Sequence, residues 1–218
     1  MELFELDQQY DLLQQEYGAK GLKSIHYGGC LNNPELCFVF MNPTGKNIAS
    51  APEWQGLRAP WIGTKSIWDL FYPLGLIDDD LYWEIKRKKP IEWTPEFAEA
   101  IYSNLRNHKV FITNFVKCTQ VDARHLPNHI YFKYLPLLEE EVSIVDPKCI
   151  FLFGNNVSSV FLGKRIMVSS CRKKRFEKTI QKKSYACYPV FYPVGNGRRN
   201  IDKSIEDIRW VIQNNLGQ

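Results

Sequence analysis

The sequence lacks paired cysteine motifs and long apolar runs. Its six cysteines are scattered without a Cys-x-x-Cys pair, and no apolar segment approaches the roughly 20 residues that a helix needs to cross a bilayer. The amino terminus does not show the pattern of a signal peptide. We therefore expect reduced thiols, a cytoplasmic location and no association with a membrane.

Internal repeats and low-complexity linkers are also missing from the sequence. A chain of 218 residues, 44% of them hydrophobic, is long enough for one sizeable core and short for two. We expect a single domain over residues 1–218 and a monomeric protein.

Basic residues are clustered, although the net charge is only +4. One run lies at residues 86–89, and another lies at 172–175 inside a lysine-rich segment at 164–183. Such patches suit the phosphate backbone of a nucleic acid, but a solvated loop kept soluble by its charge explains either run alone equally well. The wider stretch at 163–185 is polar and poor in pattern, which is compatible with a hairpin or an insertion.

Hydrophobic periodicity predicts alternating strands and helices. Apolar runs of strand length lie at residues 36–41, 110–113, 149–153 and 186–192. Amphipathic patterns predict helices at residues 3–17, 64–74, 95–106, 131–145, a short stretch ending at 162, and 201–216. This alternation is typical of an α/β fold, and we expect a three-layer α/β/α arrangement with a central four-stranded, mainly parallel sheet.

Polar side chains follow the ends of three of these predicted strands. Parallel strands share a direction, so the loops after them open on one edge of the sheet, and Asn42, Asn114 and Tyr192 are expected to converge there. Asn114 is a candidate reader of a ligand. Its amide carries both a donor and an acceptor, so it can pair with the edge of a nucleobase.

One motif of this region resembles a phosphate-binding P-loop only superficially. Gly45-Lys46 has the central pair of that motif, but Phe40 stands where its first glycine belongs, and Asn47 replaces the metal-binding Ser or Thr. The sequence therefore argues against nucleoside triphosphate hydrolysis.

Two candidate reactive or metal-binding sites are also weak. His125 and His129 have the spacing of a helical metal pair, but Pro127 lies between them and no glutamate follows His125. Cys118 would be a nucleophile only with a base and an orienting partner, and a buried structural cysteine is the commoner case. We predict no metal site.

Several short motifs together carry a family resemblance. They occur in a fixed order over about residues 36–200 and are Met41-Asn42-Pro43, Pro60-Trp61-Ile62-Gly63, Thr113-Asn114-Phe115-Val116-Lys117-Cys118, Asp146 to Gly154, and Phe191-Tyr192-Pro193. In this order they resemble the uracil-DNA glycosylase superfamily. The first resembles the Met-Asn-Pro of its single-strand-selective class, and the third resembles the Thr-Asn-x-Val-Lys-Cys phrase of its thermophile-type class.

The resemblance implies roles for the residues of these motifs. Asn42 would hold a water against the anomeric carbon, with Met41 and Pro43 beside the base. Trp61 would stack on the flipped base, although a core aromatic is the alternative. Asn114 would donate to uracil O4 and accept from N3–H, a pattern that cytosine reverses, although a strand-end cap is the alternative.

The resemblance also suggests a DNA-binding surface. The loop from Gly195 to Asn200 follows the last motif, where the superfamily inserts its minor-groove loop. Gly195, Arg198 and Arg199 of this loop, together with Lys46, are the predicted contacts to DNA.

The chain departs from the family pattern at two points. Thermophile-type members bind an iron–sulfur cluster through four cysteines, but this chain has Tyr134 where the partner of Cys118 belongs and lacks the Cys-x-x-Cys pair, so we expect no cofactor. Most members carry His-Pro-Ser where this chain has Tyr192-Pro193-Val194. A lost donor of this type lowers the rate by about 10²–10³. The Tyr192 hydroxyl either takes the place of that donor or packs in the core.

The sequence therefore predicts a monofunctional DNA glycosylase of base excision repair, which flips out and hydrolytically removes uracil or a related deaminated base. The expected partner is DNA, and the choice between a double strand, a single strand and RNA stays open. The alternative is a non-catalytic nucleic-acid-binding or base-sensing module that kept the pocket and lost turnover. A third hypothesis is a small-molecule or nucleotide-processing enzyme on the same scaffold.

Overall fold

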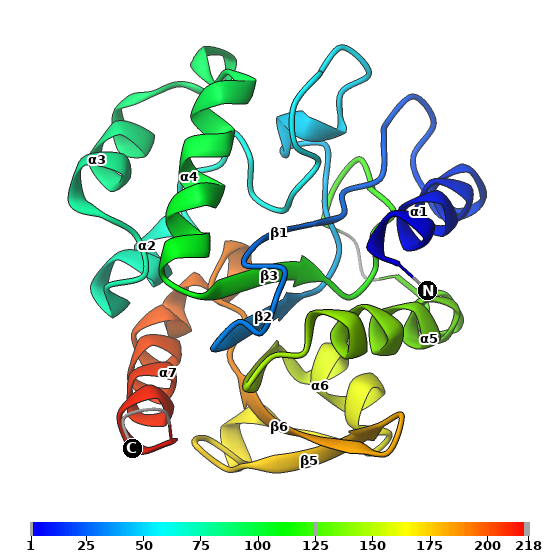
Figure 1. Cartoon of the computed structure of the whole chain (residues 1–218), viewed down its shortest axis with the longest axis vertical. Coiled ribbons are helices and arrows are strands. Elements are labelled where there is room, and N and C mark those ends of the chain that lie inside the picture. The colour runs from blue at the N-terminus through cyan, green and yellow to red at the C-terminus, as the bar shows by residue number, and fades with distance from the viewer. Residues whose placement is uncertain (1, 124–125, 216–218) are drawn as a thin grey trace.

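The centre of the structure is a mixed β-sheet (Figure 1). The computed structural model describes residues 2–123 and 126–215. Within these ranges one sheet has six strands in the order β1-β3-β2-β4-β6-β5. Their bounds are Tyr27–Gly29 (β1), Leu36–Phe40 (β2), Val110–Asn114 (β3), Cys149–Phe153 (β4), Phe176–Ile180 (β5) and Lys183–Val190 (β6). The four inner strands are mutually parallel, and the two edge strands are antiparallel to their neighbours.

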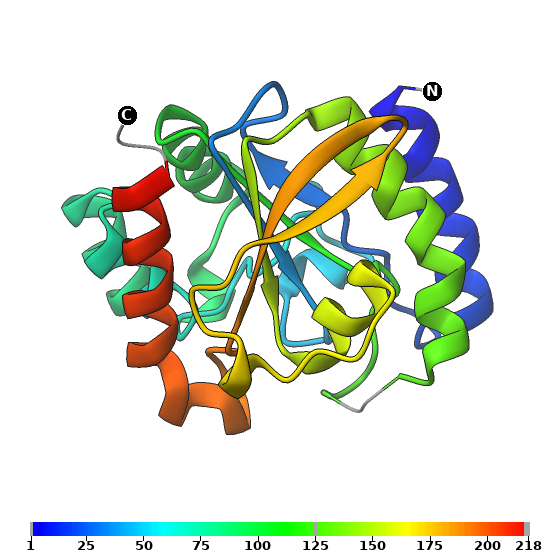
Figure 2. The ribbon, with the colours of Figure 1, turned by 90° about the horizontal axis from the view of Figure 1, so that it is seen from below.

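Helices cover both faces of this sheet, as Figure 2 shows. One face packs against α2 (Trp68–Phe71), α3 (Asp79–Arg87), α4 (Pro95–Asn107) and α7 (Ile201–Asn215). The other face packs against α1 (Leu3–Tyr17), α5 (Asn128–Val145) and α6 (Asn155–Leu162). None of the helices in these described ranges is long and apolar enough to cross a membrane.

The inner strands are buried on both faces. In β2, Phe38 and Phe40 point into one core and Cys37 and Val39 into the other. The rings of Phe40 and Phe153 stack across β2 and β4 with 4.3 Å between their centroids. A strand covered on both sides has no polar face, which is why these strands read as continuous apolar runs.

The α/β class predicted from the sequence is confirmed, whereas the predicted four-stranded sheet is too small. The two additional strands lie at the edges. β1 is three residues long and includes two glycines, and β5 has the mostly polar sequence Phe-Glu-Lys-Thr-Ile with alternating exposure. Neither forms an apolar run, because an edge strand of this kind is not enclosed by helices on both faces.

Some predicted element bounds were also wrong. The helix expected at residues 64–74 is α-helical only over α2 and continues as a 3₁₀ turn over Tyr72–Leu74. Thr64 is instead part of a turn, in which its N–H and its hydroxyl both donate to the Trp61 carbonyl, at 3.1 and 2.8 Å. The last parallel strand ends at Val190 rather than at 192, and α3 was not predicted.

The basic segment at 163–185 includes β5, which forms an antiparallel hairpin with β6. Much of its positive charge is neutralised within the protein. The ion pairs are Arg172 with Glu206 and Asp207, Lys173 with Glu206, Arg175 with Glu177, Lys178 with Glu139, and Lys183 with Asp146. In the described part of the chain, no carboxylate pairs with Lys164, Arg165, Lys174 or Lys182.

We predict that Arg172→Ala destabilises the fold by about 3 kcal/mol. Asp207 is only 1% exposed, and the Arg172 guanidinium donates to both of its carboxylate oxygens at 2.9–3.1 Å. Removing the guanidinium leaves a buried carboxylate without its counter-charge. Urea unfolding measures the loss. Arg175→Ala is the control, because its exposed pair with Glu177 is worth at most about 1 kcal/mol, and equal losses in the two variants would contradict the prediction.

Candidate functional site

The carboxyl ends of the four parallel strands form the edge at which open α/β sheets bind ligands. Asn42 follows β2, Asn114 ends β3, Gly154 follows β4 and Tyr192 follows β6. Main-chain hydrogen bonds continue across this edge beyond the strands. Phe115 N–H donates to the Phe40 carbonyl at 2.7 Å. The expected convergence of Asn42, Asn114 and Tyr192 on one edge follows from this topology.

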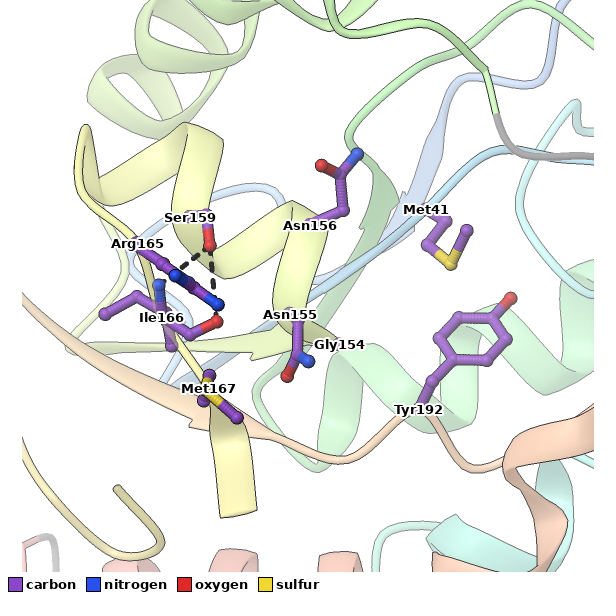
Figure 3. A pocket seen from close by; sticks show the side chains of 9 residues that line it. All are labelled: Met41, Gly154, Asn155, Asn156, Ser159, Arg165, Ile166, Met167 and Tyr192. Atoms are coloured by element: carbon purple, nitrogen blue, oxygen red, sulfur yellow. Dashed lines mark hydrogen bonds between the residues drawn. The ribbon is translucent and has the colours of Figure 1, made fainter. Parts of the chain in front are cut away.

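A cavity of about 530 Å³ opens at this edge (Figure 3). Its lining residues are Met41, Gly154, Asn155, Asn156, Ser159, Arg165, Ile166, Met167 and Tyr192. Of these, only Met41 and Tyr192 were among the predicted site residues. Two sequence signals point to some of the others: the Gly154 turn follows a predicted strand, and Arg165 belongs to the basic segment.

Asn114 is buried and has a free donor. Its side chain is 2% exposed, and its Nδ2 has no hydrogen-bond partner within the described ranges. A buried donor without a partner costs about 1–3 kcal/mol. Such a group is stabilised when a ligand supplies the acceptor.

A buried ion pair fixes the main chain of Asn114 from behind. Lys117 Nζ donates to the Asn114 carbonyl at 2.5 Å, to Thr113 Oγ1 at 2.5 Å and to Glu141 Oε1 at 3.0 Å. Glu141 also accepts from the hydroxyls of Tyr10, at 2.8 Å, and Thr113, at 2.6 Å. Lys117 and Glu141 are both 0% exposed. Burial lowers the pKa of the Lys117 ammonium, and the neighbouring Glu141 charge opposes that shift.

Asn42 lies in the turn after β2. It is 8% exposed, and its Nδ2 donates to the Pro43 carbonyl at 3.2 Å. Asn47, further along the same loop, donates to the Ala59 carbonyl at 2.8 Å and so ties this loop to the segment before Trp61. Lys46 is exposed.

Trp61 is partly buried and has a strained backbone. Its φ of 74° lies in the left-handed region, where a bulky residue is rare. Such an outlier often marks a position under functional constraint. Its ring packs edge-on against Phe40, with centroids 5.0 Å apart, and its Nε1 is buried with no partner in the described chain. Trp61 therefore packs against the core and does not line the cavity.

Tyr192 forms one wall of the cavity, with its hydroxyl on the side where Met41 lies (Figure 3). Burial raises the pKa of this phenol, and the neighbouring Tyr131 adds to the shift. The ring also packs against the core formed with α2, α4 and α7. Behind it, a Cβ at Gly197 would lie 2.0 Å from the Tyr192 carbonyl oxygen, so only glycine fits there.

The predicted DNA-contacting loop forms a 3₁₀ turn over Gly195–Asn200 that leads into α7. Gly195 has a φ of 56° and is exposed, as is Arg199. Arg198 instead donates to Asp69 Oδ2 in α2 at 2.7 Å and to the carbonyl of Ser66, just before α2, at 2.9 Å. The charge of Arg198 is therefore balanced within the protein, and that of Arg199 faces solvent.

The structure offers no metal site among the residues that it describes, where no group of three or more His, Cys, Asp or Glu side chains is placed to hold an ion. Cys118 is buried, and burial raises the pKa of its thiol. His129 is exposed, while His125, its predicted partner in the weak metal motif, lies outside the described residues.

We predict that Lys117→Met lowers the free energy of unfolding by about 3–5 kcal/mol, because it leaves the Glu141 carboxylate buried without its ammonium. The double variant Lys117→Met/Glu141→Met should recover most of this loss, since an apolar pair of similar volume removes both buried charges. Chemical denaturation of the three proteins measures the effect. A double variant less stable than Lys117→Met would refute the prediction.

A family model described as the uracil DNA glycosylase superfamily matches residues 29–209. The matched range includes the cavity and all four strand ends, and it excludes α1. A search of curated proteins found no match.

Proposed function

The chain belongs to the uracil DNA glycosylase superfamily, and from that membership we propose that it hydrolyses the N-glycosidic bond of uracil, or of a related deaminated base, flipped out of DNA. The observation that carries this proposal is the buried Asn114 amide, whose Nδ2 has no partner within the described residues. It lies at the sheet edge where such folds bind ligands.

Base selection rests on Asn114. Its Nδ2 donates to uracil O4, and its amide oxygen accepts from N3–H. Cytosine presents a donor and an acceptor in the opposite order, so it would leave both groups of a buried amide unpaired. The Lys117 bond to the Asn114 carbonyl supports this role, because it limits how far the residue can move.

Bond cleavage needs partners for two developing charges. As the bond from the anomeric carbon to the base breaks, its electron pair leaves with uracil and the sugar becomes an oxocarbenium ion. Asn42 then holds a water whose oxygen bonds to that carbon and whose proton passes to solvent. Positioning suffices here, since the carbon is already strongly electrophilic. The turn that holds Asn42 is fixed by its own loop contacts.

Tyr192 takes the place of the missing histidine as a neutral donor to uracil O2. Its raised pKa keeps the phenol protonated at neutral pH, and its position in the cavity wall leaves it partly accessible. A neutral phenol stabilises the leaving anion less than a charged donor does. Lys46 and Arg199, both exposed, are the proposed phosphate contacts. Gly195 and Arg198 shape the turn that carries Arg199.

The tyrosine at position 192 also favours a second candidate function. A base-sensing module would need the Asn114 amide to select the base but not the stronger donor to cleave its bond. It would bind DNA or RNA in a salt-dependent way and release no base.

We expect wild-type protein to release uracil from a uracil-containing oligonucleotide, and Asn42→Ala to reduce kcat/KM by about 100-fold or more through loss of the positioned water. Asn114→Ala removes the group assigned to base selection. It should lower kcat/KM for uracil by about as much as Asn42→Ala does. Asn107→Ala, an exposed residue at the end of α4, is the control. If wild type and Asn42→Ala both release no base, the glycosylase proposal fails. Salt-dependent binding of the same oligonucleotide without release of a base would then support the base-sensing function.

The contribution of Tyr192 should not depend on pH in the neutral range. Because burial raises the pKa of its phenol, the donor stays protonated up to and beyond the usual tyrosine value of about 10. Tyr192→Phe should therefore lower kcat/KM by a constant factor of about 10 to 100 between about pH 6 and pH 9. Single-turnover rates across that range measure the ratio of wild type to Tyr192→Phe, and a ratio that changes with pH would contradict a phenol that stays protonated throughout.

A further inference from the structure

The cavity extends well beyond the residues assigned to the excised base. It reaches from Met41 and Tyr192 on one side to Arg165 and Met167 on the other (Figure 3). Its volume of about 530 Å³ falls within the range of about 300–1,000 Å³ typical of sites for whole small molecules. This is more space than one pyrimidine ring fills, and Asn114, which would hold that ring, lies outside the lining.

The far wall of this cavity is held in place by the protein. Ser159 Oγ accepts from the Ile166 N–H at 2.9 Å, and Asn155 Oδ1 accepts from the Val168 N–H at 2.9 Å. These bonds fasten the segment at 164–168 to the first turns of α6. The cavity therefore has a defined shape before any ligand binds.

The lining combines apolar surfaces with groups that lack a partner. Met41, Ile166 and Met167 supply the apolar surfaces. Asn156 Nδ2 is buried and makes no hydrogen bond of normal geometry within residues 2–123 and 126–215, although Asn156 lies close enough to the Tyr131 hydroxyl to oppose the rise that burial causes in the pKa of that phenol. An amide on an apolar wall is suited to the edge of a nucleobase.

Arg165 supplies the charge at the outer end of the cavity. Five basic residues of the surrounding segment are paired with carboxylates. Arg165 is exposed and, like Lys164, Lys174 and Lys182, has no carboxylate partner among the described residues, but of these four only Arg165 lines the cavity. Uracil is uncharged and would gain little from a guanidinium at this point. A phosphate is the group that a free guanidinium binds well.

We propose that this cavity is a subsite for the nucleotide next to the excised base on a single DNA strand, with its base against Met41, Ile166 and Met167, its edge at Asn156 and its phosphate on Arg165. The inference rests on the proposed function. A neighbouring base that enters the cavity has left its own pair, so the subsite selects a single strand over a duplex.

The first test measures binding to a short labelled thymidine oligonucleotide, which holds no uracil and cannot be turned over by the proposed activity. Arg165→Gln should weaken binding and reduce the slope of log K against log salt by about 0.7, the value for one phosphate contact on a single strand. Lys182→Gln is the matched control. It removes the same charge from an exposed residue without a described carboxylate partner, at the β5–β6 turn.

This control lies far from the cavity, since β6 is eight residues long and so separates the turn from Tyr192 by about 25 Å. Lys182→Gln should leave the salt slope unchanged. Equal effects of the two variants would overturn the subsite, because the segment would then act only as a diffuse positive surface.

The second test addresses the base. We compare uracil-containing single strands in which the nucleotide on the 5′ or the 3′ side of the uracil carries an abasic sugar. Removing the base on one of the two sides should lower kcat/KM about tenfold for wild type. In Asn156→Leu the same removal should have a smaller effect, because the contact to the edge of that base is already lost. If both abasic substrates react as fast as the intact strand, the subsite is refuted.

The two proposals fail separately. A wild type that releases no base refutes the glycosylase function, and the abasic comparison is then made by binding affinity instead of by rate. In that case a difference between Arg165→Gln and Lys182→Gln, together with weaker binding of one abasic strand, still supports the subsite.

Discussion

The arrangement of the site depends on the buried pair of Lys117 and Glu141. Both side chains are 0% exposed, and two charges are tolerated in such surroundings only when their hydrogen-bonding capacity is filled. Lys117 uses its three donors on Thr113, Asn114 and Glu141, while Glu141 also accepts from Tyr10. The pair thereby joins β3, the loop after it, α5 and α1. Asn114 stands at the centre of this junction.

The helix α1 completes this network although it lies outside the range matched by the family model. Tyr10 reaches Glu141, and one turn later Gln14 Oε1 accepts from the Thr119 N–H at 2.7 Å. Gln14 therefore holds the loop after β3 directly, and Tyr10 acts on it through Glu141 of α5. The family core supplies the Asn114 amide, and an element outside the matched range supplies part of its rigidity.

The elements that could be predicted are those whose burial requires a recognisable pattern of apolar residues in the sequence. β2, β3 and β4 are enclosed by helices on both faces and read as apolar runs, so the topology placed Asn42 and Asn114 at one edge. The residues that form the far wall of the cavity show no such pattern in the sequence. This wall is held by side chain to main chain bonds from Asn155 and Ser159, and these follow no periodicity.

The charges of the basic segment could likewise be only partly predicted from the sequence. Its run of cations is visible in the sequence, but the carboxylates that neutralise Arg172 and Lys173 lie in α7, more than thirty residues away. Only the folded chain brings Glu206 and Asp207 to them. The sequence could not show which cations of the segment remain without a carboxylate partner in the described residues, nor that Arg165 is the one of them that lines the cavity.

In the proposed reaction every group assigned to the excised base is neutral: Asn42, Asn114 and Tyr192. Neutral dipoles stabilise a developing charge only when they are already oriented, because each one contributes less than an ionised group would. A site without its histidine therefore depends more strongly on rigid support. The Lys117–Glu141 pair gives Asn114 that support, and the tight approach of Gly197 to the Tyr192 carbonyl gives it to Tyr192. A weaker donor thus contributes to the reaction only as far as the packing behind it fixes its position.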